Sequence, residues 1–332
     1  MNQEKLQTEL YVTRDFGKKL SDTIEFIRSN WRLLLRYETY LLLPISVILA
    51  FFTNNLVSDY SGMLTSMIGV TMYGSGIYRN FDNILEWFIN LFGSFVCYGA
   101  AFIALSAVVY AVIYFVFFTD KKMTEVSFEE LKPRLWYYAK RSLVLSLVTL
   151  VLCIVASIAL VMVLVGLTFL FSSMRFALLP IYLFIILAVV AVTIPLLLVM
   201  PIYMLEPECS VVNAFMKAFR LGFATWAGVF AVSFVIGLVS TIFEMVTTMP
   251  WYVMIFTKEI FTLAHDGDAG MTGSFLFSFT QYLFCILQCF GMMVASTLSI
   301  VGITIQYGHA ADKIDGRGVA QHIDHFDQFD NV

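Results

Sequence analysis

The sequence predicts an all-α membrane protein, a polytopic bundle of transmembrane helices with six spans and three cytoplasmic interfacial amphipathic helices. Composition and patterning both support this class. Of the 332 residues, 60% are hydrophobic and only 13% are charged, whereas a typical soluble domain carries about 25% charged residues. Six long stretches of the chain contain no Asp, Glu, Lys or Arg at all.

The six uncharged stretches are the predicted spans. A helix needs about 20 apolar residues to cross a bilayer, because each residue advances it by about 1.5 Å and hydrocarbon cannot satisfy an open backbone group. The predicted spans are residues 39–56, 87–118, 142–171, 176–205, 221–243 and 274–307. Pro195 and Pro201 predict a kink near the end of the fourth span.

The distribution of basic residues predicts the orientation. Of the 20 Lys and Arg residues, 17 fall in the N-terminal segment, the 119–141 loop, the 206–220 loop and the C-terminal tail. Only Arg79, Arg175 and Lys258 fall on the opposite side. Because basic loops stay in the cytoplasm, both termini are expected there. The basic N-terminal segment lacks the apolar run of a signal peptide, so no cleavage is expected.

A patterned polar segment precedes each pair of spans. In residues 14–36, Phe16, Leu20, Ile24 and Trp31 recur at helical intervals between charged residues, which predicts an amphipathic helix on anionic lipid headgroups. The sequence therefore predicts a single membrane domain, 1–332, which divides into interfacial helices 14–36, 127–141 and 209–220, span pairs 39–118, 142–205 and 221–307, and a cytoplasmic tail 308–332. Two interpretations remain open: a threefold internal repeat, or the polar lead-in that any pair of spans needs.

One stretch combines these signals and carries a resemblance to a known family. The sequence PIYMLEPECSVVNAFMKAFRL, residues 201–221, resembles the membrane region of glycerophosphoryl diester phosphodiesterase membrane-domain proteins and their uncharacterised bacterial relatives. There a proline-ended span, a glutamate and a Ser-x-x-x-Ala helix lead into the next span. The N-terminal segment is similar to polytopic inner-membrane proteins of Bacteroidota. The resemblance is specific around this stretch and general elsewhere.

The resemblance implies a bacterial inner-membrane domain without known catalytic residues. In the named enzymes a separate soluble barrel performs the phosphodiesterase reaction, and this chain is expected to have no room for one.

Five residues of this stretch form a predicted structural or lipid-facing motif. Pro201 is expected to end the fourth span, Glu206 to lie at the start of the next helix and Ser210 to cap it. Lys217 and Arg220 are expected near the end of that helix, facing lipid phosphates. On this interpretation the Ser210 cap contributes more stability than the Glu206 carboxylate. The alternative is a ligand site.

Catalytic, cofactor-binding and metal-binding residues are not predicted, and the protein is not expected to be an enzyme. The chain has no His-Glu-x-x-His, Walker or nucleophile-elbow motif. The tail HIDHFDQFD, residues 322–330, fits a solvated acidic tail or docking peptide, with weak metal binding as the alternative. The five cysteines lack Cys-x-x-Cys spacing and are expected to be buried small hydrophobic side chains. A net charge of -4 without a basic face argues against nucleic acid.

The predicted function is a non-enzymatic scaffold or accessory subunit with membrane-protein partners; the alternative is a small-molecule or lipid transporter. Gly291 and Ala295, like Ala224 and Gly228, have the small-x-x-x-small spacing that allows close helix packing in lipid. Gln281 and Gln288 share a helix face. Such amides either bond neighbouring helices or line a pore.

Overall fold

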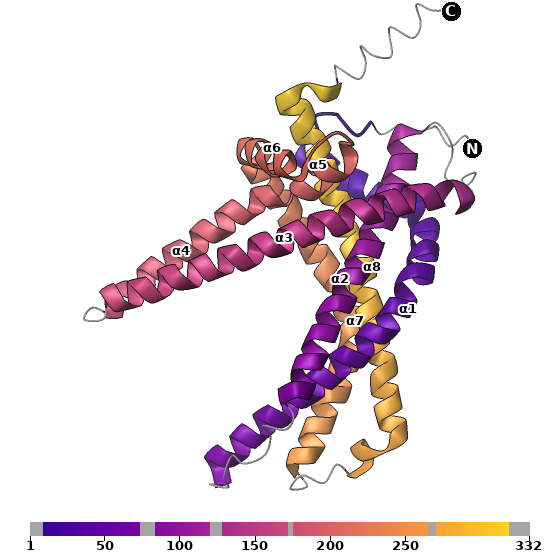
Figure 1. The fold of residues 1–332 in the computed structure, drawn as a ribbon. Helices are drawn as coiled ribbons and strands as arrows, with labels where there is room; N and C mark the ends of the chain where they lie inside the picture. Colours follow the sequence, from indigo (N-terminus) through magenta and orange to yellow (C-terminus); the bar gives the residue numbers. More distant parts are fainter. Residues whose placement is uncertain (1–8, 74–83, 120–127, 172–174, 265–269, 319–332) are drawn as a thin grey trace, which may run out of the picture. The chain divides into compact units, whose positions relative to one another are not determined.

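The computed structural model describes residues 9–73, 84–119, 128–171, 175–264 and 270–318. These residues form helices and no β-strand. In chain order the helices are α1 (Phe16–Tyr73), α2 (Ile84–Phe118), α3 (Phe128–Leu170), α4 (Arg175–Leu196), α5 (Val199–Leu205), α6 (Val211–Ala224), α7 (Trp226–Ala264) and α8 (Phe275–Asp315). A 3-10 turn, Gly270–Gly273, precedes α8. The all-α prediction is confirmed (Figure 1).

Six helical segments of the described chain are long and apolar enough to cross a membrane. They lie in α1, α2, α3, α4 with α5, α7 and α8, so the prediction of six spans is confirmed and the chain is a multi-pass membrane protein. Several helices exceed the predicted spans. The 58 residues of α1 follow a path of about 87 Å at 1.5 Å per residue, far more than the roughly 30 Å of a hydrocarbon core.

Two of the three predicted interfacial segments are continuous with the spans that follow them. From Phe16 on, the first segment runs into the first span within α1, and from Phe128 on, the second runs into the third span within α3. Neither passage contains Gly or Pro at the predicted boundary, so nothing interrupts the helical hydrogen bonds there. The third segment does form a separate helix, α6, which ends at Ala224; its C-cap, Thr225, separates it from α7.

Contacts within the chain group the residues into two compact units. Unit 1 comprises Met1–Asn30, Val109–Ile236 and Ser299–Val332, and unit 2 comprises Trp31–Val108 and Gly237–Leu298. Helices α1, α2, α7 and α8 contribute residues to both units.

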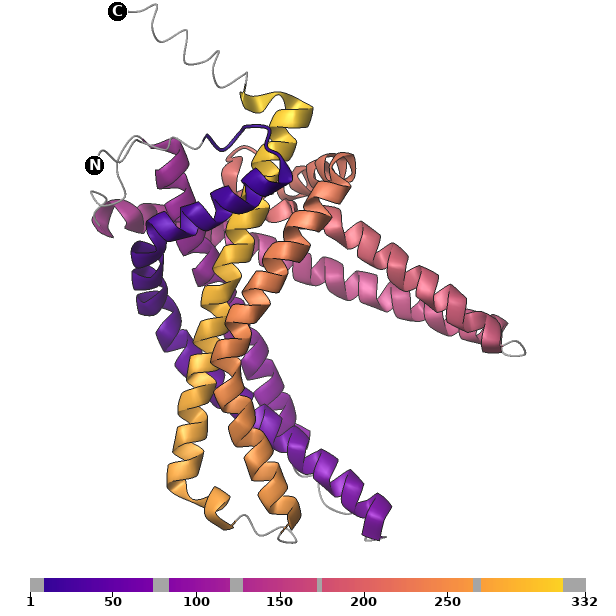
Figure 2. The same ribbon diagram turned by 180° about the vertical axis from the view of Figure 1, so that it is seen from behind.

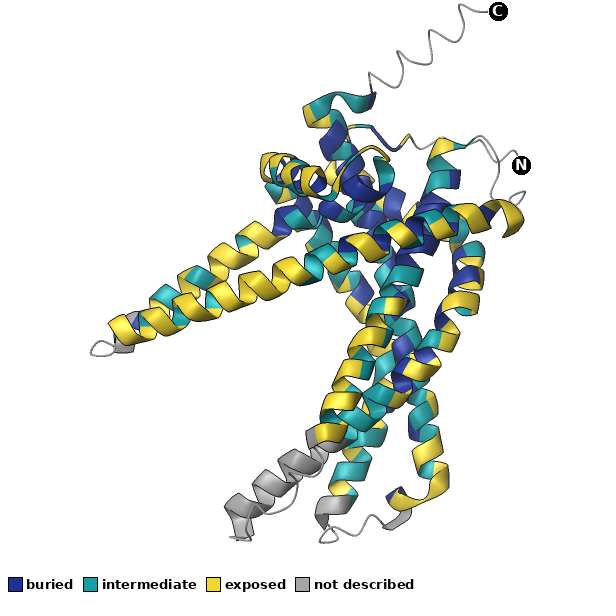
Figure 3. Cartoon of the chain, in the orientation of Figure 1, coloured by how far each residue is buried: buried dark blue, intermediate teal, exposed yellow. Residues whose placement is uncertain are grey.

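In unit 1, α3 and α4 form an antiparallel hairpin that differs from the rest of the unit. The two helices run side by side in both views (Figures 1 and 2). Most of their side chains are exposed, as the predominance of yellow shows in Figure 3. Val155 is 60% exposed, Ile158 57% and Phe184 72%. The buried core of unit 1 lies around α5, the inner face of α6, the last turns of α2 and α8 and the first turns of α3, and includes Leu131, Leu198, Ile202, Leu221 and Tyr307.

In unit 2, small and polar residues bring segments of α1, α7 and α8 together. A Cβ on Gly291 would lie 2.4 Å from Thr247 Oγ1, so only glycine allows this approach of α8 to α7. Ser240 Oγ also donates a hydrogen bond to the carbonyl of Ala295, at 3.2 Å. Gln281 Nε2 donates to Asn54 Oδ1 at 2.9 Å. The predicted close packing at Gly291 is therefore confirmed, and Gln281 bonds a neighbouring helix.

Candidate functional site

The candidate site of unit 1 begins where the fourth span ends. Helix α4 stops at Leu196, directly after Pro195, and α5 starts at Val199. The predicted kink is confirmed, but the prediction that Pro201 ends the span is wrong, because α5 continues to Leu205. Pro201 is the third residue of α5, and a first helical turn needs no amide hydrogen from that position.

Arg141 of α3 fixes the loop that joins α5 to α6. Its guanidinium donates hydrogen bonds to the carbonyls of Tyr203, Glu206 (2.9 Å) and Pro207 (2.8 Å). It also lies over the Tyr203 ring, 4.0 Å from the ring centre. These bonds satisfy the carbonyl groups at the end of α5 that have no partner within the helix. A single arginine therefore sets the path of the loop.

Ser210 starts α6 as the sequence predicts. Its backbone is extended, with φ -72° and ψ 160°, and its side chain accepts a hydrogen bond from the Asn213 amide at 3.3 Å. The N-cap prediction is confirmed. The cap determines where α6 begins and hence which of its faces turns toward α5 and α8.

Glu206 is the centre of a charged cluster. Its carboxylate accepts hydrogen bonds from Lys217 Nζ at 2.8 Å and from the Tyr307 hydroxyl, and Arg317 lies at 3.0 Å from its second oxygen. Its side chain is only 12% exposed. Glu206 does not lie at the start of the next helix, as the sequence predicts, because it is the C-cap of α5 and α6 begins at Val211 after the Ser210 N-cap. Three donors from α6, α8 and the segment after α8 hold it more strongly than the α6 dipole could.

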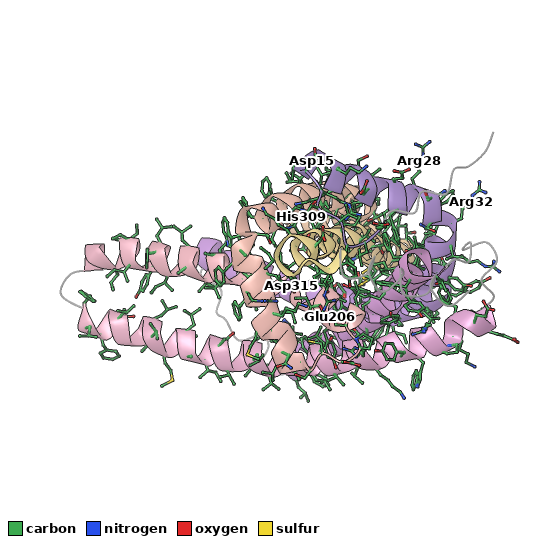
Figure 4. All side chains as sticks on the ribbon, turned by 90° about the horizontal axis from the view of Figure 1, so that it is seen from above. Asp15, Arg28, Arg32, Glu206, His309 and Asp315 are labelled. Carbon is green, nitrogen blue, oxygen red and sulfur yellow. The ribbon has the colours of Figure 1, made fainter. Side chains whose placement is uncertain are left out.

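Asp315, the last residue of α8, completes this cluster. It pairs with Lys217 Nζ at 3.3 Å and with Arg220 at 2.7 Å. Figure 4 labels Asp315 and Glu206, the two carboxylates that Lys217 bridges. The predicted partners of Lys217 and Arg220 were lipid phosphates; the structure instead gives both side chains carboxylate partners. We call Glu206, Lys217, Arg220, Tyr307, Asp315 and Arg317 the junction.

Gly316 gives the chain the turn that the junction requires. Its φ of +64° is left-handed, a conformation that glycine adopts without the steric penalty of a Cβ. The turn ends α8 and returns Arg317 toward Glu206 and Tyr307, whose hydroxyl accepts a hydrogen bond from Arg317 at 3.3 Å. Gly316 thus acts as a glycine C-cap of α8.

The pKa values of Cys209, which lies beside the junction, and of Arg317, which belongs to it, are both raised. Burial raises the pKa of the Cys209 thiol, and the Glu206 carboxylate acts in the same direction. Burial lowers the pKa of Arg317, but Tyr307, Glu206 and Tyr11 outweigh it, so that pKa lies above its ordinary value. Cys209 therefore stays a thiol, which is a poor nucleophile, and Arg317 stays charged.

A surface cavity of about 750 Å³ opens beside the junction. Its lining mixes acidic, basic and apolar side chains: Leu205, Glu206, Pro207, Glu208, Cys209, Asn213, Met216, Lys217, Arg220 and Arg317. Four of these residues, Glu206, Lys217, Arg220 and Arg317, already take part in ion pairs of the junction.

Sequence reasoning missed half of the junction. Tyr307, Asp315 and Arg317 lie about 100 residues beyond Glu206, and no periodicity connects them to it. The glycine at position 316 is a typical sign of a helix end. It could have predicted that the chain turns back after Asp315 and that Arg317 lies near the end of α8.

A second missed residue is Glu38 in unit 2. Its carboxylate is 1% exposed and accepts a hydrogen bond from Thr297 Oγ1 at 2.6 Å. The predicted first span began at Thr39, so this carboxylate was counted outside the membrane.

The cysteine prediction is correct only for part of the chain. Cys285 and Cys289 are buried, but Cys97 and Cys209 are half-buried and Cys153 is exposed on the α3 surface. All five are free thiols.

Possible metal ligands were the next feature of the site that the sequence raised, in the acidic, histidine-containing tail. In the described ranges, no three His, Cys, Asp or Glu side chains gather in a way that could hold a metal ion. The tail residues His322 and His325 lie outside the described residues.

No protein-family model, curated protein or solved structure matches this chain.

Proposed function

We propose that the protein is a non-enzymatic scaffold or accessory subunit of a membrane complex. The observation that carries this proposal is the α3–α4 hairpin, two membrane-length helices whose apolar side chains are largely exposed. Lipid tails are as apolar as these side chains, so helices in a bilayer associate through packing rather than through burial from water. The hairpin therefore offers a long surface to the helices of another membrane protein.

The way the junction uses its charges supports a role without catalysis. The Glu206 carboxylate already accepts from Lys217, Tyr307 and Arg317, so it is poorly placed to exchange protons with a substrate. The Cys209 thiol is held protonated. A catalytic group needs a pKa tuned toward its reaction, whereas the raised pKa of Cys209 disfavours its nucleophilic thiolate.

Photocrosslinking tests the scaffold proposal. A photoreactive phenylalanine analogue at Ile158 of α3 or at Phe184 of α4 is expected to crosslink one defined membrane protein in cells that produce the chain natively. The same analogue at Ile202, which is 0% exposed, is the matched control and is expected to give no such adduct. The partner should copurify in mild detergent at a fixed ratio. Lipid adducts alone at both hairpin positions would refute a protein partner there.

We also propose a bacterial inner-membrane location with both termini in the cytoplasm. The support is the asymmetry of basic residues, 17 against three. Reporter fusions at residue 332 and in the 119–141 loop are expected to give a cytoplasmic signal, and fusions at residues 62 or 268 a periplasmic one. A periplasmic signal at residue 332 would contradict the proposal.

The first part of α1 is proposed to bind anionic lipid at the membrane surface. Phe16, Ile24 and Trp31 are exposed. Lys18, Arg28 and Arg32 are exposed as well, so the free side of this segment carries both apolar and charged side chains. A peptide of residues 12–36 is expected to bind anionic liposomes. Replacing Ile24, Ile27 and Trp31 together with Asp should abolish that binding, since each buried side chain contributes roughly 1.5 to 3 kcal/mol. Undiminished binding would contradict the proposal.

A transporter of a small molecule or lipid is the second candidate, and Glu38 favours it. A buried carboxylate within a membrane segment is costly and marks transport pathways in many proteins. Among the described residues Thr297 is its hydrogen-bond partner and no Lys or Arg pairs with it. If the chain translocates lipid, labelled lipid in proteoliposomes should cross the bilayer with the parent protein and not with Glu38→Gln. The relationship to glycerophosphoryl diester phosphodiesterase membrane domains stays a prediction.

A further inference from the structure

One face of α3 carries an exposed stripe of two lysines and a tryptophan. Lys132, Trp136 and Lys140 follow one another at intervals of four residues, so they lie on the same side of the helix. All three side chains are exposed, and Trp136 is exposed by 66%. The ammonium of Lys140 lies over the Trp136 ring, 5.2 Å from the ring centre. We call these three residues the basic stripe.

The opposite face of this part of α3 packs into unit 1. Its buried residues are Leu131, Leu135, Tyr138, Ser142 and Leu145. The two arginines of the same part have protein partners as well. Arg134 donates a hydrogen bond to the Tyr114 hydroxyl at 2.6 Å, and Arg141 donates to carbonyls of the loop between α5 and α6. The helix therefore directs its arginines to the protein and its lysines outward.

The basic stripe has no such partners in the described part of the chain. No Asp or Glu there forms an ion pair with Lys132 or Lys140. The indole N–H of Trp136 is also unused by the described residues, whereas that of Trp226 donates to the Ala191 carbonyl at 2.9 Å. Two ammonium groups and one indole N–H thus face outward as free donors.

Beyond Lys140 the same face of α3 becomes purely apolar. It continues at intervals of three, four and seven residues through side chains that are 45% to 57% exposed: Leu143, Leu147, Ile154, Ile158, Val161 and Val165. This exposed surface is yellow along α3 in Figure 3. From Leu143 to Val165 the helix advances about 33 Å, close to the roughly 30 Å of a hydrocarbon core. The apolar part of the face therefore matches the thickness of one bilayer core.

Lys140 lies where the headgroups of that bilayer begin. It precedes Leu143 by about 4.5 Å of helix, and the headgroup layer adds about 5 to 8 Å to each side of the core. Its ammonium extends toward Trp136, away from the apolar part, as lysines at a membrane edge do. Tryptophan likewise prefers the headgroup level. Both side chains therefore lie in the layer that holds lipid phosphates.

The acidic residues of this part of α3 do not neutralise Lys140. Glu129 and Glu130 lie in the first turn of α3, where the helix dipole favours carboxylates. Lys140 lies about 16 Å further along the helix axis than Glu129, which exceeds the screening length of about 8 Å at physiological ionic strength. Lys132 lies one turn from Glu129, so it is the more strongly screened of the two lysines.

We propose that the basic stripe binds the phosphate of an anionic phospholipid, with the Lys140 ammonium and the Trp136 indole N–H as donors and Lys132 as a weaker attraction. The acyl chains of the same lipid lie along the apolar residues that begin at Leu143. A free phosphate ion has no such chains, so the lipid is the occupant. The proposal does not depend on the scaffold function, because a partner at Ile158 would lie about 27 Å along the helix from Lys140.

Native mass spectrometry of the full chain released from nanodiscs tests the basic stripe. The parent protein is expected to retain phosphatidylglycerol in preference to zwitterionic phosphatidylcholine. Lys140→Gln should weaken the apparent affinity for phosphatidylglycerol by about fivefold, the effect of one basic side chain near an anionic membrane surface. Trp136→Leu and Lys132→Gln should weaken it by less. Lys313→Gln is the matched control, since Lys313 is an exposed lysine in the last turn of α8, and it should retain as much lipid as the parent.

Thermal unfolding in detergent separates lipid binding from folding. Without lipid, Lys140→Gln should melt at the temperature of the parent, because Lys140 has no protein acceptor to lose. Added phosphatidylglycerol should raise the melting temperature of the parent more than that of Lys140→Gln, since a ligand of the folded state stabilises it. Equal retention of phosphatidylglycerol by the parent and Lys140→Gln would overturn the proposal. So would an equal loss in Lys313→Gln, or inorganic phosphate that stabilises the parent as much as the lipid does at constant ionic strength.

Discussion

The α3–α4 hairpin and the junction belong to the same unit but distribute polarity in opposite ways. In the hairpin, apolar side chains such as Val155 and Phe184 are exposed. In the junction, charged side chains such as Glu206 and Asp315 are largely covered, at 12% and 15% exposure, and pair with cations from other segments. A soluble protein shows the reverse arrangement on its surface.

This difference follows from the solvent that each region faces. A bilayer covers apolar side chains at no cost, so the hairpin needs few contacts with the rest of the unit. Charges that leave water need partners, because an unpaired buried charge is strongly destabilising. The stability of unit 1 is therefore expected to depend on the junction and very little on the hairpin.

The largest effect is expected from Glu206→Ala. The substitution leaves Lys217, Tyr307 and Arg317 without their shared acceptor, and breaking one partner of a buried ion pair costs about 3 to 5 kcal/mol. The partial exposure of Arg317, at 32%, favours the lower end, about 3 kcal/mol. The free energy of unfolding, measured by SDS titration in mixed micelles, should fall by this amount.

Glu208→Ala is the matched control for Glu206→Ala. Glu208 is exposed and lies two residues along the same loop, so its replacement should change the unfolding free energy by less than about 0.5 kcal/mol. Equal effects of the two substitutions would mean that net charge, rather than the pairing at Glu206, stabilises the loop.

The second effect compares two isoleucines of unit 1. Ile202 in α5 is 0% exposed, whereas Ile158 in α3 is 57% exposed. Ile202→Ala should lower the unfolding free energy by about 2 to 3 kcal/mol, because it opens a cavity in a packed core. Ile158→Ala should change it by less than about 0.5 kcal/mol, since hydrocarbon or detergent refills the space. A large loss at Ile158 would show that the hairpin packs against protein even in the isolated chain.

The spans could be predicted from sequence because they depend on local composition. An uncharged apolar run is helical in a bilayer whatever its neighbours are, and all six runs became helices. The cap at Ser210 was also predictable, because its acceptor and the Asn213 amide lie within one turn. The prediction failed where a residue could adopt two roles locally. Pro201 either ends a helix or occupies its first turn, and packing around α5 determined the second.

The junction could not be predicted because its contacts join distant segments. Glu206 and Tyr307 are 101 positions apart in the sequence, and Arg141 and Pro207 are 66 positions apart. A helical pattern shows which face of α6 carries Lys217, but it does not show which helix end lies opposite. The sequence suggests an exposed carboxylate at Glu206, whereas the structure covers it with three donors. We therefore now expect Glu206 to contribute more stability than the Ser210 cap.

The third effect compares two glycines, one beside the junction and one in the hairpin. A Cβ at Gly222 of α6 would lie 2.6 Å from Pro195 Cα, whereas a Cβ at Gly166 of α3 would meet nothing within 4 Å. Gly222→Ala should lower the unfolding free energy by about 1 to 2 kcal/mol, because backbone must shift to admit the methyl group. Gly166→Ala should raise it by up to about 1 kcal/mol, since Ala favours helix more than Gly does. A loss at both positions would remove the distinction between the two regions.

The smallest effect is expected from Ser210→Ala. Ser210 is exposed, and its single cap bond to the Asn213 amide is 3.3 Å long. Losing an N-cap costs about 1 kcal/mol, and the Arg141 bonds to the same loop remain. Ser210→Asp, which keeps an acceptor at the helix start, should retain most of the parent's unfolding free energy.

Ser210 also separates the structural interpretation of residues 201–221 from a ligand site. If the stretch shapes the crossing from α5 to α6, Ser210→Ala and Glu206→Ala should both destabilise the protein, and Glu206→Ala should do so about threefold more, the ratio of a broken buried ion pair to a lost cap. A ligand site beside the junction predicts instead that Glu206→Ala leaves unfolding unchanged in the absence of ligand. It also predicts that native mass spectrometry detects a bound molecule in the parent protein and not in the variant. The three donors around Glu206 make the first outcome the expected one, because their charges and hydroxyl lose their acceptor whether or not a ligand is present.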